Sequence, residues 1–117
     1  MAAALGFGIN RCSVRIIGRR AITLSGPASE ELSKTGFAVL LGASLVCAHF
    51  LFGAIEALYD VSKGGQQAMP AAVLSIVSHT LFGYVTAFAA ARLDSWHAGV
   101  LVAILVHSLW NRTVMAL

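Results

Sequence analysis

The sequence has few charged residues: only 11% of its 117 positions are Asp, Glu, Lys or Arg, whereas 58% are apolar. An ordinary soluble domain has about 25% charged residues, so this chain has too few to cover a surface that faces water. The shortage excludes a soluble enzyme, a disordered tail and a nucleic-acid-binding module. It predicts a small, all-α integral membrane protein surrounded by a lipid bilayer, with no nucleic acid among its partners.

Cysteine and proline are also scarce, with two of each. Cys12 and Cys47 do not form a disulfide framework, and Cys47 lies inside an apolar run, where it is expected to pack. Pro27 and Pro70 are each placed to open a helix, because proline suits the first helical turn. A chain of this length forms one domain at most.

Three apolar stretches are long enough to cross a bilayer, which takes about 20 residues. They cover residues 35–59, 70–91 and 98–117. A polar turn at 60–69 and a tight connection at 93–97 separate them. The sequence therefore predicts a transmembrane bundle of about three helices, which forms one domain over residues 27–117.

Residues 1–26 form a basic arm of a different kind. The arm has four arginines and no acidic residue, a composition that fits a cytoplasmic juxtamembrane arm and also has features of a mitochondrial transit peptide. The order of the helices puts the arm and Arg92 on one side of the membrane, opposite Lys63 and Arg112. The positive-inside rule then predicts a cytoplasmic N-terminus in a bacterial inner membrane. The alternative is a mitochondrial membrane.

Ionisable side chains inside the predicted spans are the strongest candidates for function, since a charged group at a helix centre costs about 3 kcal/mol on insertion scales. His79 and His107 each lie nine residues inside a span, or about 13 Å at 1.5 Å per residue. Glu56 follows His49 by seven residues on one helical face. We expect His79, His107 and Glu56 to converge on a functional polar site. The alternative is that each histidine only makes one hydrogen bond between helices.

A second polar group, Glu30, Glu31 and Lys34, stands at the start of the first apolar stretch. Glu30 and Lys34 have the i,i+4 spacing of a helical ion pair, and acidic residues in a first helical turn interact favourably with the helix dipole. These structural roles do not explain why two adjacent glutamates enter an apolar helix beside the membrane. A catalytic role therefore stays open.

Four segments, taken together, resemble the motifs of the PrsW family of intramembrane metalloproteases, which are relatives of the CAAX-prenyl-protease and bacteriocin-processing membrane proteases. EELSK at 30–34 matches the family's EExxK motif, and FGAIE at 52–56 matches its FxxxE motif. SHTLFGY at 78–84 is similar to the third, histidine-bearing motif. HSLWN at 107–111 is similar to the last motif and also fits the HxxxN pattern of the CAAX-protease relatives. The resemblance covers residues 26–112.

This resemblance implies an all-helical membrane protease that hydrolyses a peptide bond of a membrane-protein substrate, within or beside the bilayer. It implies a zinc ion held by Glu56, His79 and His107, since imidazole and carboxylate are suitable zinc ligands that leave one position open for water. Glu30 or Glu31 would then be the general base that removes a proton from that water.

The last motif adds one more residue to the implied site. Asn111 would orient His107 or stabilise an oxyanion. The CAAX-protease relatives imply a metal-free version, in which glutamate alone activates water and the His and Asn side chains stabilise the oxyanion. The sequence favours neither version.

The spacing of the first two motifs departs from the family pattern, in which they lie on separate spans joined by a sizeable loop. Only 24 residues lie between Glu31 and Glu56, and on one straight helix the two residues would be about 37 Å apart. Either the helix breaks near Gly42, or the glutamate pair cannot complete the site. A short, truncated or inactive family member is therefore expected.

Two other classes of function stay open. The chain could be a small non-catalytic membrane protein whose polar residues hold it in a larger complex, with residues 1–26 as an organelle-targeting segment. It could also be a small transporter or proton-path subunit, because intramembrane His and Glu residues also mark ion routes. Assembly as a homo- or hetero-oligomer is compatible with each class.

Overall fold

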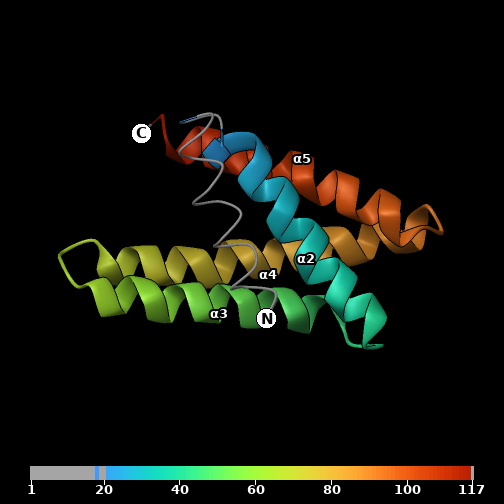
Figure 1. Ribbon diagram of the computed structural model, residues 1–117, viewed down its shortest axis with the longest axis horizontal. Coiled ribbons are helices and arrows are strands. Elements are labelled where there is room, and N and C mark those ends of the chain that lie inside the picture. The colour runs from blue at the N-terminus through green and yellow to red at the C-terminus, as the bar shows by residue number, and fades with distance from the viewer. Residues whose placement is uncertain (1–17, 19–20, 117) are drawn as a thin grey trace.

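The computed structural model describes Gly18 and residues 21–116. The basic arm expected over residues 1–26 therefore lies mostly outside the described residues. A short π-helical turn, η1 (Ala21–Ser25), leads into four α-helices: α2 (Gly26–Leu40), α3 (Leu45–Lys63), α4 (Ala68–Arg92) and α5 (Trp96–Val114). The described part of the chain contains helices and no strand (Figure 1), which confirms the all-α prediction.

Helices α3 and α4 form an antiparallel hairpin, which is the main body of the fold (Figure 1). Glycines let these two helices approach closely. A Cβ atom at Gly53 would lie 2.9 Å from the carbonyl oxygen of Ser75, and one at Gly83 would lie 2.8 Å from the Cβ atom of His49. Helix α5 packs against α4, while α2 crosses the hairpin and contacts both α3 and α5.

The structure differs from the sequence prediction in the first apolar stretch, where the apolar pattern predicts one helix over 35–59. That stretch is divided between α2, which ends at Leu40, and α3, which begins at Leu45. Gly42 lies between them with a φ of +62°, a conformation that glycine adopts without strain and that commonly ends a helix. The alternative drawn from the motif spacing, a break near Gly42, is therefore confirmed. The Ser44 hydroxyl then caps α3 by accepting a hydrogen bond from a backbone amide of its first turn.

This break also determines which ends of the bundle are neighbours. The chain turns back after α2, so the start of α2 lies beside the C-terminal end of α5, where the Asn111 amide donates a hydrogen bond to the Ile22 carbonyl oxygen (3.0 Å). The connection at 93–95 lies at the opposite end of α5. The expectation that the basic arm shares a side with Arg92 is therefore corrected for its described residues, because it assumed an unbroken first helix.

The other two helices agree closely with the predicted spans. Helix α4 begins two residues before Pro70 and ends at Arg92. Helix α5 begins at Trp96, where the Ser95 hydroxyl accepts a hydrogen bond from a backbone amide of the first turn, and it ends at Val114. Within the described residues, α3 and α4 are long and apolar enough to cross a membrane.

The polarity of the fold is reversed relative to that of a soluble domain. Ionisable side chains occupy its interior, where Glu31, Lys34 and His49 are at most 2% exposed. Large apolar side chains point outward, among them Leu40 on α2 and Leu58 on α3, which are 78% and 72% exposed. Cys47, which the sequence predicts to be packed, is exposed as well. Such a surface is expected where lipid surrounds the protein.

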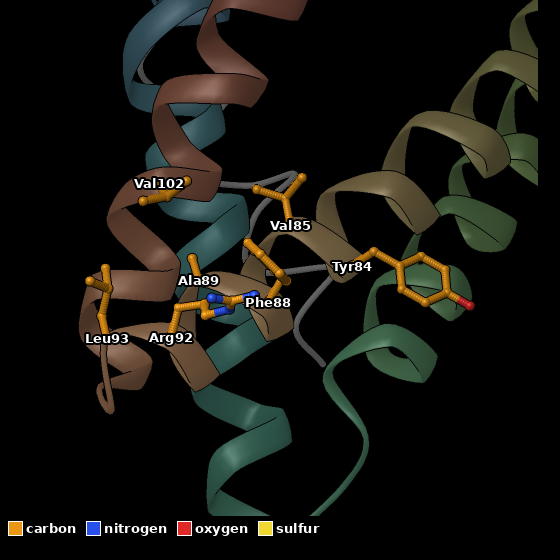
Figure 2. A pocket seen from close by; sticks show the side chains of 7 residues that line it. All are labelled: Tyr84, Val85, Phe88, Ala89, Arg92, Leu93 and Val102. Atoms are coloured by element: carbon orange, nitrogen blue, oxygen red, sulfur yellow. The ribbon is translucent and has the colours of Figure 1, made fainter.

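An apolar groove lies between the C-terminal part of α4 and α5 (Figure 2). Its lining residues are Tyr84, Val85, Phe88, Ala89, Arg92, Leu93 and Val102. Arg92 is the only charged residue of this lining, and its guanidinium group lies over the Phe88 ring, 5.0 Å from the ring centroid. The groove contains no carboxylate, imidazole or thiol group, so the candidate chemistry of the described residues lies elsewhere.

Candidate functional site

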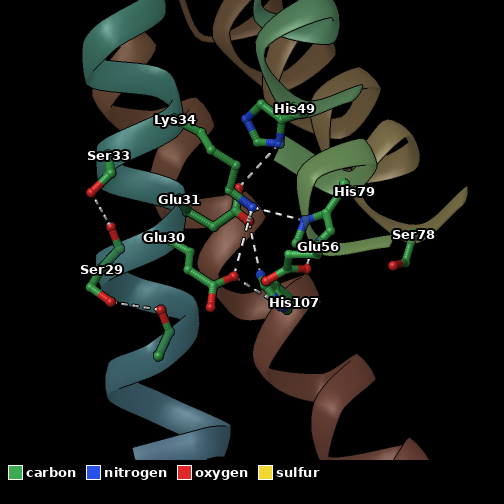
Figure 3. Close-up of polar contacts among 12 residues, drawn as sticks. Ser29, Glu30, Glu31, Ser33, Lys34, His49, Glu56, Ser78, His79 and His107 are labelled. Atoms are coloured by element: carbon green, nitrogen blue, oxygen red, sulfur yellow. Dashed lines mark hydrogen bonds and ion pairs between the residues drawn. The ribbon is translucent and has the colours of Figure 1, made fainter. Parts of the chain in front are cut away.

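Helix α2 carries the EELSK segment across the bundle, so that Glu30, Glu31 and Lys34 face the other helices (Figure 3). The spacing from each glutamate to Lys34, four and three residues, places all three side chains on one helical face. All three are buried, and Glu31 is completely so. The turn around Gly42 makes this arrangement possible, because it lets α2 run in a different direction from α3.

The Lys34 ammonium group lies at the centre of the cluster (Figure 3). It donates hydrogen bonds to Glu31 Oε1 (2.6 Å) and to His79 Nδ1 (2.9 Å). It also lies over the Phe52 ring, 4.6 Å from the ring centroid. Its distance from Glu30 Oε2 is longer, at 4.0 Å. The i,i+4 ion pair that the sequence suggests is therefore the weakest of these polar contacts, and Glu31 is the main partner.

His79 is held from both sides of its ring. Because Lys34 donates to Nδ1, the ring proton is assigned to Nε2, which donates to Glu56 Oε2 (2.6 Å). The Ser75 hydroxyl donates to the same Glu56 oxygen (3.1 Å). The close contact of α3 and α4 thus fixes the Glu56–His79 pair.

His107, on α5, is oriented by Glu31. Its Nδ1 atom donates to Glu31 Oε1 (2.8 Å), which leaves the lone pair of Nε2 available. That Nε2 atom lies 3.9 Å from Glu30 Oε2. The Phe82 ring stacks on the imidazole ring at 4.6 Å between centroids, and the His79 ring lies edge-on at 5.3 Å. The two histidines therefore meet, as the sequence predicts.

His49 belongs to the same cluster, although the site predicted from the sequence does not include it. Its Nδ1 atom lies 3.5 Å from Glu31 Oε2. Both atoms are buried and lack a hydrogen bond of good geometry within the described residues. One feature of the sequence could have added His49 to the predicted site: it precedes Glu56 by seven residues, which puts both on one face of α3. Glu31 is thus surrounded by Lys34, His107 and His49.

The two adjacent glutamates differ in their electrostatic surroundings. Burial alone would raise the pKa of Glu31, but the hydrogen bond from His107 and the charge of Lys34 outweigh it and lower the pKa to about 2. For Glu30, burial is the largest effect, Lys34 opposes it only in part, and the pKa rises to about 8. Both residues lie on α2, outside the two helices of the described residues that are both long and apolar enough to cross a membrane. Glu31 is therefore a permanently charged partner for its neighbours.

Glu30, His79 and His107 form a group that is suited to a metal ion. One possible ligand atom from each lies within 4.8 Å of the other two. A carboxylate oxygen and two imidazole nitrogens are a donor set of catalytic zinc sites. Two ligands about 2.1 Å from one ion are at most about 4.2 Å apart, so a bound ion would draw the group slightly together.

Five of the six predicted site residues come together in one cluster, but some of them have other partners than the resemblance implies. Glu30 joins the two histidines in the metal-suited group, whereas Glu56, a predicted ligand, is hydrogen-bonded to His79. The Asn111 side chain turns to η1, where its amide donates to the Ile22 carbonyl oxygen. Its contact in the structure therefore connects α5 to η1 instead of orienting His107.

No protein-family model, curated protein or solved structure matches the chain. The resemblance to the PrsW family therefore depends on the four sequence motifs. Their ionisable residues come from four different helices and meet in one cluster, in which Glu31 and His107 are hydrogen-bonded although they are 76 positions apart.

Proposed function

We propose that the protein is a PrsW-like, metal-dependent peptidase that cleaves membrane-protein substrates within or beside the bilayer. The observation that carries this proposal is the convergence of ionisable residues from all four motifs on one buried cluster. Each histidine of the metal-suited group is hydrogen-bonded to a carboxylate, His79 to Glu56 and His107 to Glu31. Carboxylate–histidine pairs of this kind orient imidazole ligands in metal sites.

The residues of the proposed site divide into metal ligands, a residue that orients a ligand, and a general base. Glu30, His79 and His107 would hold a divalent ion such as zinc, which when bound would polarise a peptide carbonyl group and make water more acidic. Glu31 orients His107, and its completely buried side chain is closed to water. The Glu56 side chain is 37% exposed, more than that of Glu30 or Glu31, so we propose Glu56 as the carboxylate that accepts a proton from water. The roles implied by the resemblance for Glu30 and Glu56 are thus exchanged.

We infer that α3, α4 and α5 cross the bilayer and enclose the cluster within it. Helices α3 and α5 have 19 residues each, or about 28 Å of length against a hydrocarbon core of about 30 Å. Ionisable side chains in a membrane protein face the bundle interior, as they do here. Helix α2 has 15 residues and is too short to cross alone. It would be held against the bundle by the hydrogen bonds of Lys34 with His79 and of Glu31 with His107.

The basic residues support a cytoplasmic N-terminus in a bacterial inner membrane. The sequence has four arginines in the basic arm, and Arg112 lies one position from Asn111, whose side chain contacts Ile22. Arg92 is at the other end of α5, beside the 93–95 connection. The more basic end of a bundle faces the cytoplasm, so the start of α2 and the C-terminal end of α5 are placed there.

Cysteine labelling of intact cells tests this orientation. In a chain whose two native cysteines are replaced by serine, Ala43→Cys and Asp94→Cys should react with a membrane-impermeant maleimide added outside. Met115→Cys should react only after permeabilisation, because it lies at the opposite end of the bundle. Equal labelling of Met115→Cys and Asp94→Cys from one side would contradict the orientation.

A purely structural cluster is the second candidate function, and the contacts of Lys34 favour it. The ammonium group already pairs with Glu31 and donates to His79, so the cluster has an internal positive charge. The protein would then be a non-catalytic membrane protein that assembles with other chains. Cleavage of a co-expressed membrane protein that depends on Glu56 separates the two candidates, because only the peptidase predicts it.

A further inference from the structure

Lys34 is a member of the cluster that the proposed peptidase mechanism leaves without a role. Its side chain is 1% exposed. Its Nζ atom lies 2.9 Å from His79 Nδ1 and 4.0 Å from Glu30 Oε2. The ammonium group therefore approaches two of the three residues that are suited to a metal ion.

We propose that Lys34 is a tethered cation that competes with the metal ion for this site. The inference rests on the metal centre proposed above. The ammonium group occupies the position beside His79 and Glu30 in the arrangement described here, and it leaves that position when a divalent ion binds. Lys34 thus lowers the metal affinity of the site without being a ligand.

Two constraints make the positions of the ammonium group and the ion mutually exclusive. The Nε2 atom of His79 is engaged by Glu56, so Nδ1 is the nitrogen left for a metal, and its single lone pair serves either the ammonium group or the ion. In addition, two positive charges about 4 Å apart repel each other, and they do so more strongly inside a protein than in water.

The cluster also offers an acceptor for the displaced ammonium group. Glu31 Oε1 already accepts from Lys34, and Glu31 Oε2 is buried without a hydrogen-bond partner in the described part of the chain. A rotation of the Lys34 side chain toward this carboxylate keeps the buried charge paired while it releases His79. The buried ion pair with Glu31 is therefore retained in both states.

Zinc titration of the detergent-purified protein tests the inference. Lys34→Met removes the charge, and Lys34→Gln removes it while keeping a hydrogen-bond donor for Glu31, so the test does not depend on a single variant. Both should bind Zn²⁺ about tenfold more tightly than the wild type, or more, because the competing charge is gone. Lys34→Arg keeps the charge and should not tighten binding. Lys63→Met, at the exposed end of α3, is the matched control and should bind like the wild type.

The outcomes separate the failure of this inference from the failure of the metal centre. Zinc binding that is equal or weaker in Lys34→Gln, and that still depends on His79 and His107, would overturn the competition and leave the metal centre intact. No zinc binding in the wild type or in any Lys34 variant would overturn both. Circular dichroism of each variant, with the helix content of the wild type, is the check on folding.

Discussion

Glu31→Ala is expected to lower the free energy of unfolding by about 3–5 kcal/mol, because it leaves the Lys34 ammonium group buried without its carboxylate. The two groups are 2.6 Å apart, and both side chains are at most 1% exposed, so water cannot replace the lost partner. His107 Nδ1 loses its acceptor at the same time. Unfolding by denaturant in detergent micelles, followed by circular dichroism, measures the effect.

Glu30→Ala is the matched control for this prediction. It removes the neighbouring carboxyl group of the same helix, which lies farther from the Lys34 ammonium group, at 4.0 Å. The loss should be smaller than that of Glu31→Ala, because Glu30 makes no contact with Lys34 as short as the 2.6 Å contact of Glu31. The double variant Glu31→Ala/Lys34→Met should recover part of the stability, because it leaves no unpaired charge. Equal free energies of unfolding for Glu31→Ala and Glu30→Ala would contradict the claim that Glu31 is the main partner of Lys34.

Glu56→Gln is expected to reduce peptide-bond cleavage about 100-fold or more. Glutamine keeps the size of the side chain and an oxygen that accepts from His79 Nε2, but it cannot take a proton from water. The measurement is cleavage of co-expressed candidate membrane-protein substrates at matched protein levels. Metal content should fall less than in His79→Ala, because Glu56 is not one of the three proposed ligands and glutamine keeps an acceptor for His79 Nε2.

Asp60→Asn is the control for the Glu56 prediction. Asp60 lies one turn further along α3, and it lies outside the metal-suited group of described residues. Its replacement should leave cleavage unchanged. Wild-type cleavage that survives Glu56→Gln, and is instead lost in Glu30→Gln or Glu31→Gln, would return the role of general base to the glutamate pair.

Helical periodicity is enough to predict the meeting of several site residues. His79 and His107 lie at similar depth on adjacent antiparallel helices. The short connection between α4 and α5 keeps these helices side by side, and the two rings are in contact. Glu56 follows from the same reasoning, because α3 and α4 form a hairpin with glycines at their contact. These contacts follow from the spacing of the residues along each helix, and that spacing can be read from the sequence.

The position of α2 depends on one backbone conformation that the apolar pattern does not reveal. The stretch over 35–59 is mostly apolar, so its hydropathy indicates a single span, and only Gly42 and Ser44 mark the interruption. The direction of α2 after that break is determined by tertiary packing. For this reason the exchange of roles between Glu30 and Glu56 could not be predicted from spacing.

The metal content of the detergent-purified protein tests the proposed metal centre most directly. Growth with added zinc, followed by elemental analysis, should give about one zinc ion per chain in the wild type. His97→Ala, which changes an exposed histidine stacked on Trp96, should retain it. His79→Ala and His107→Ala should each lose most of it, because each removes one of the three ligands. Zinc that is absent from both the wild type and Lys34→Gln, or that remains in both His79→Ala and His107→Ala, would contradict the proposed metal centre.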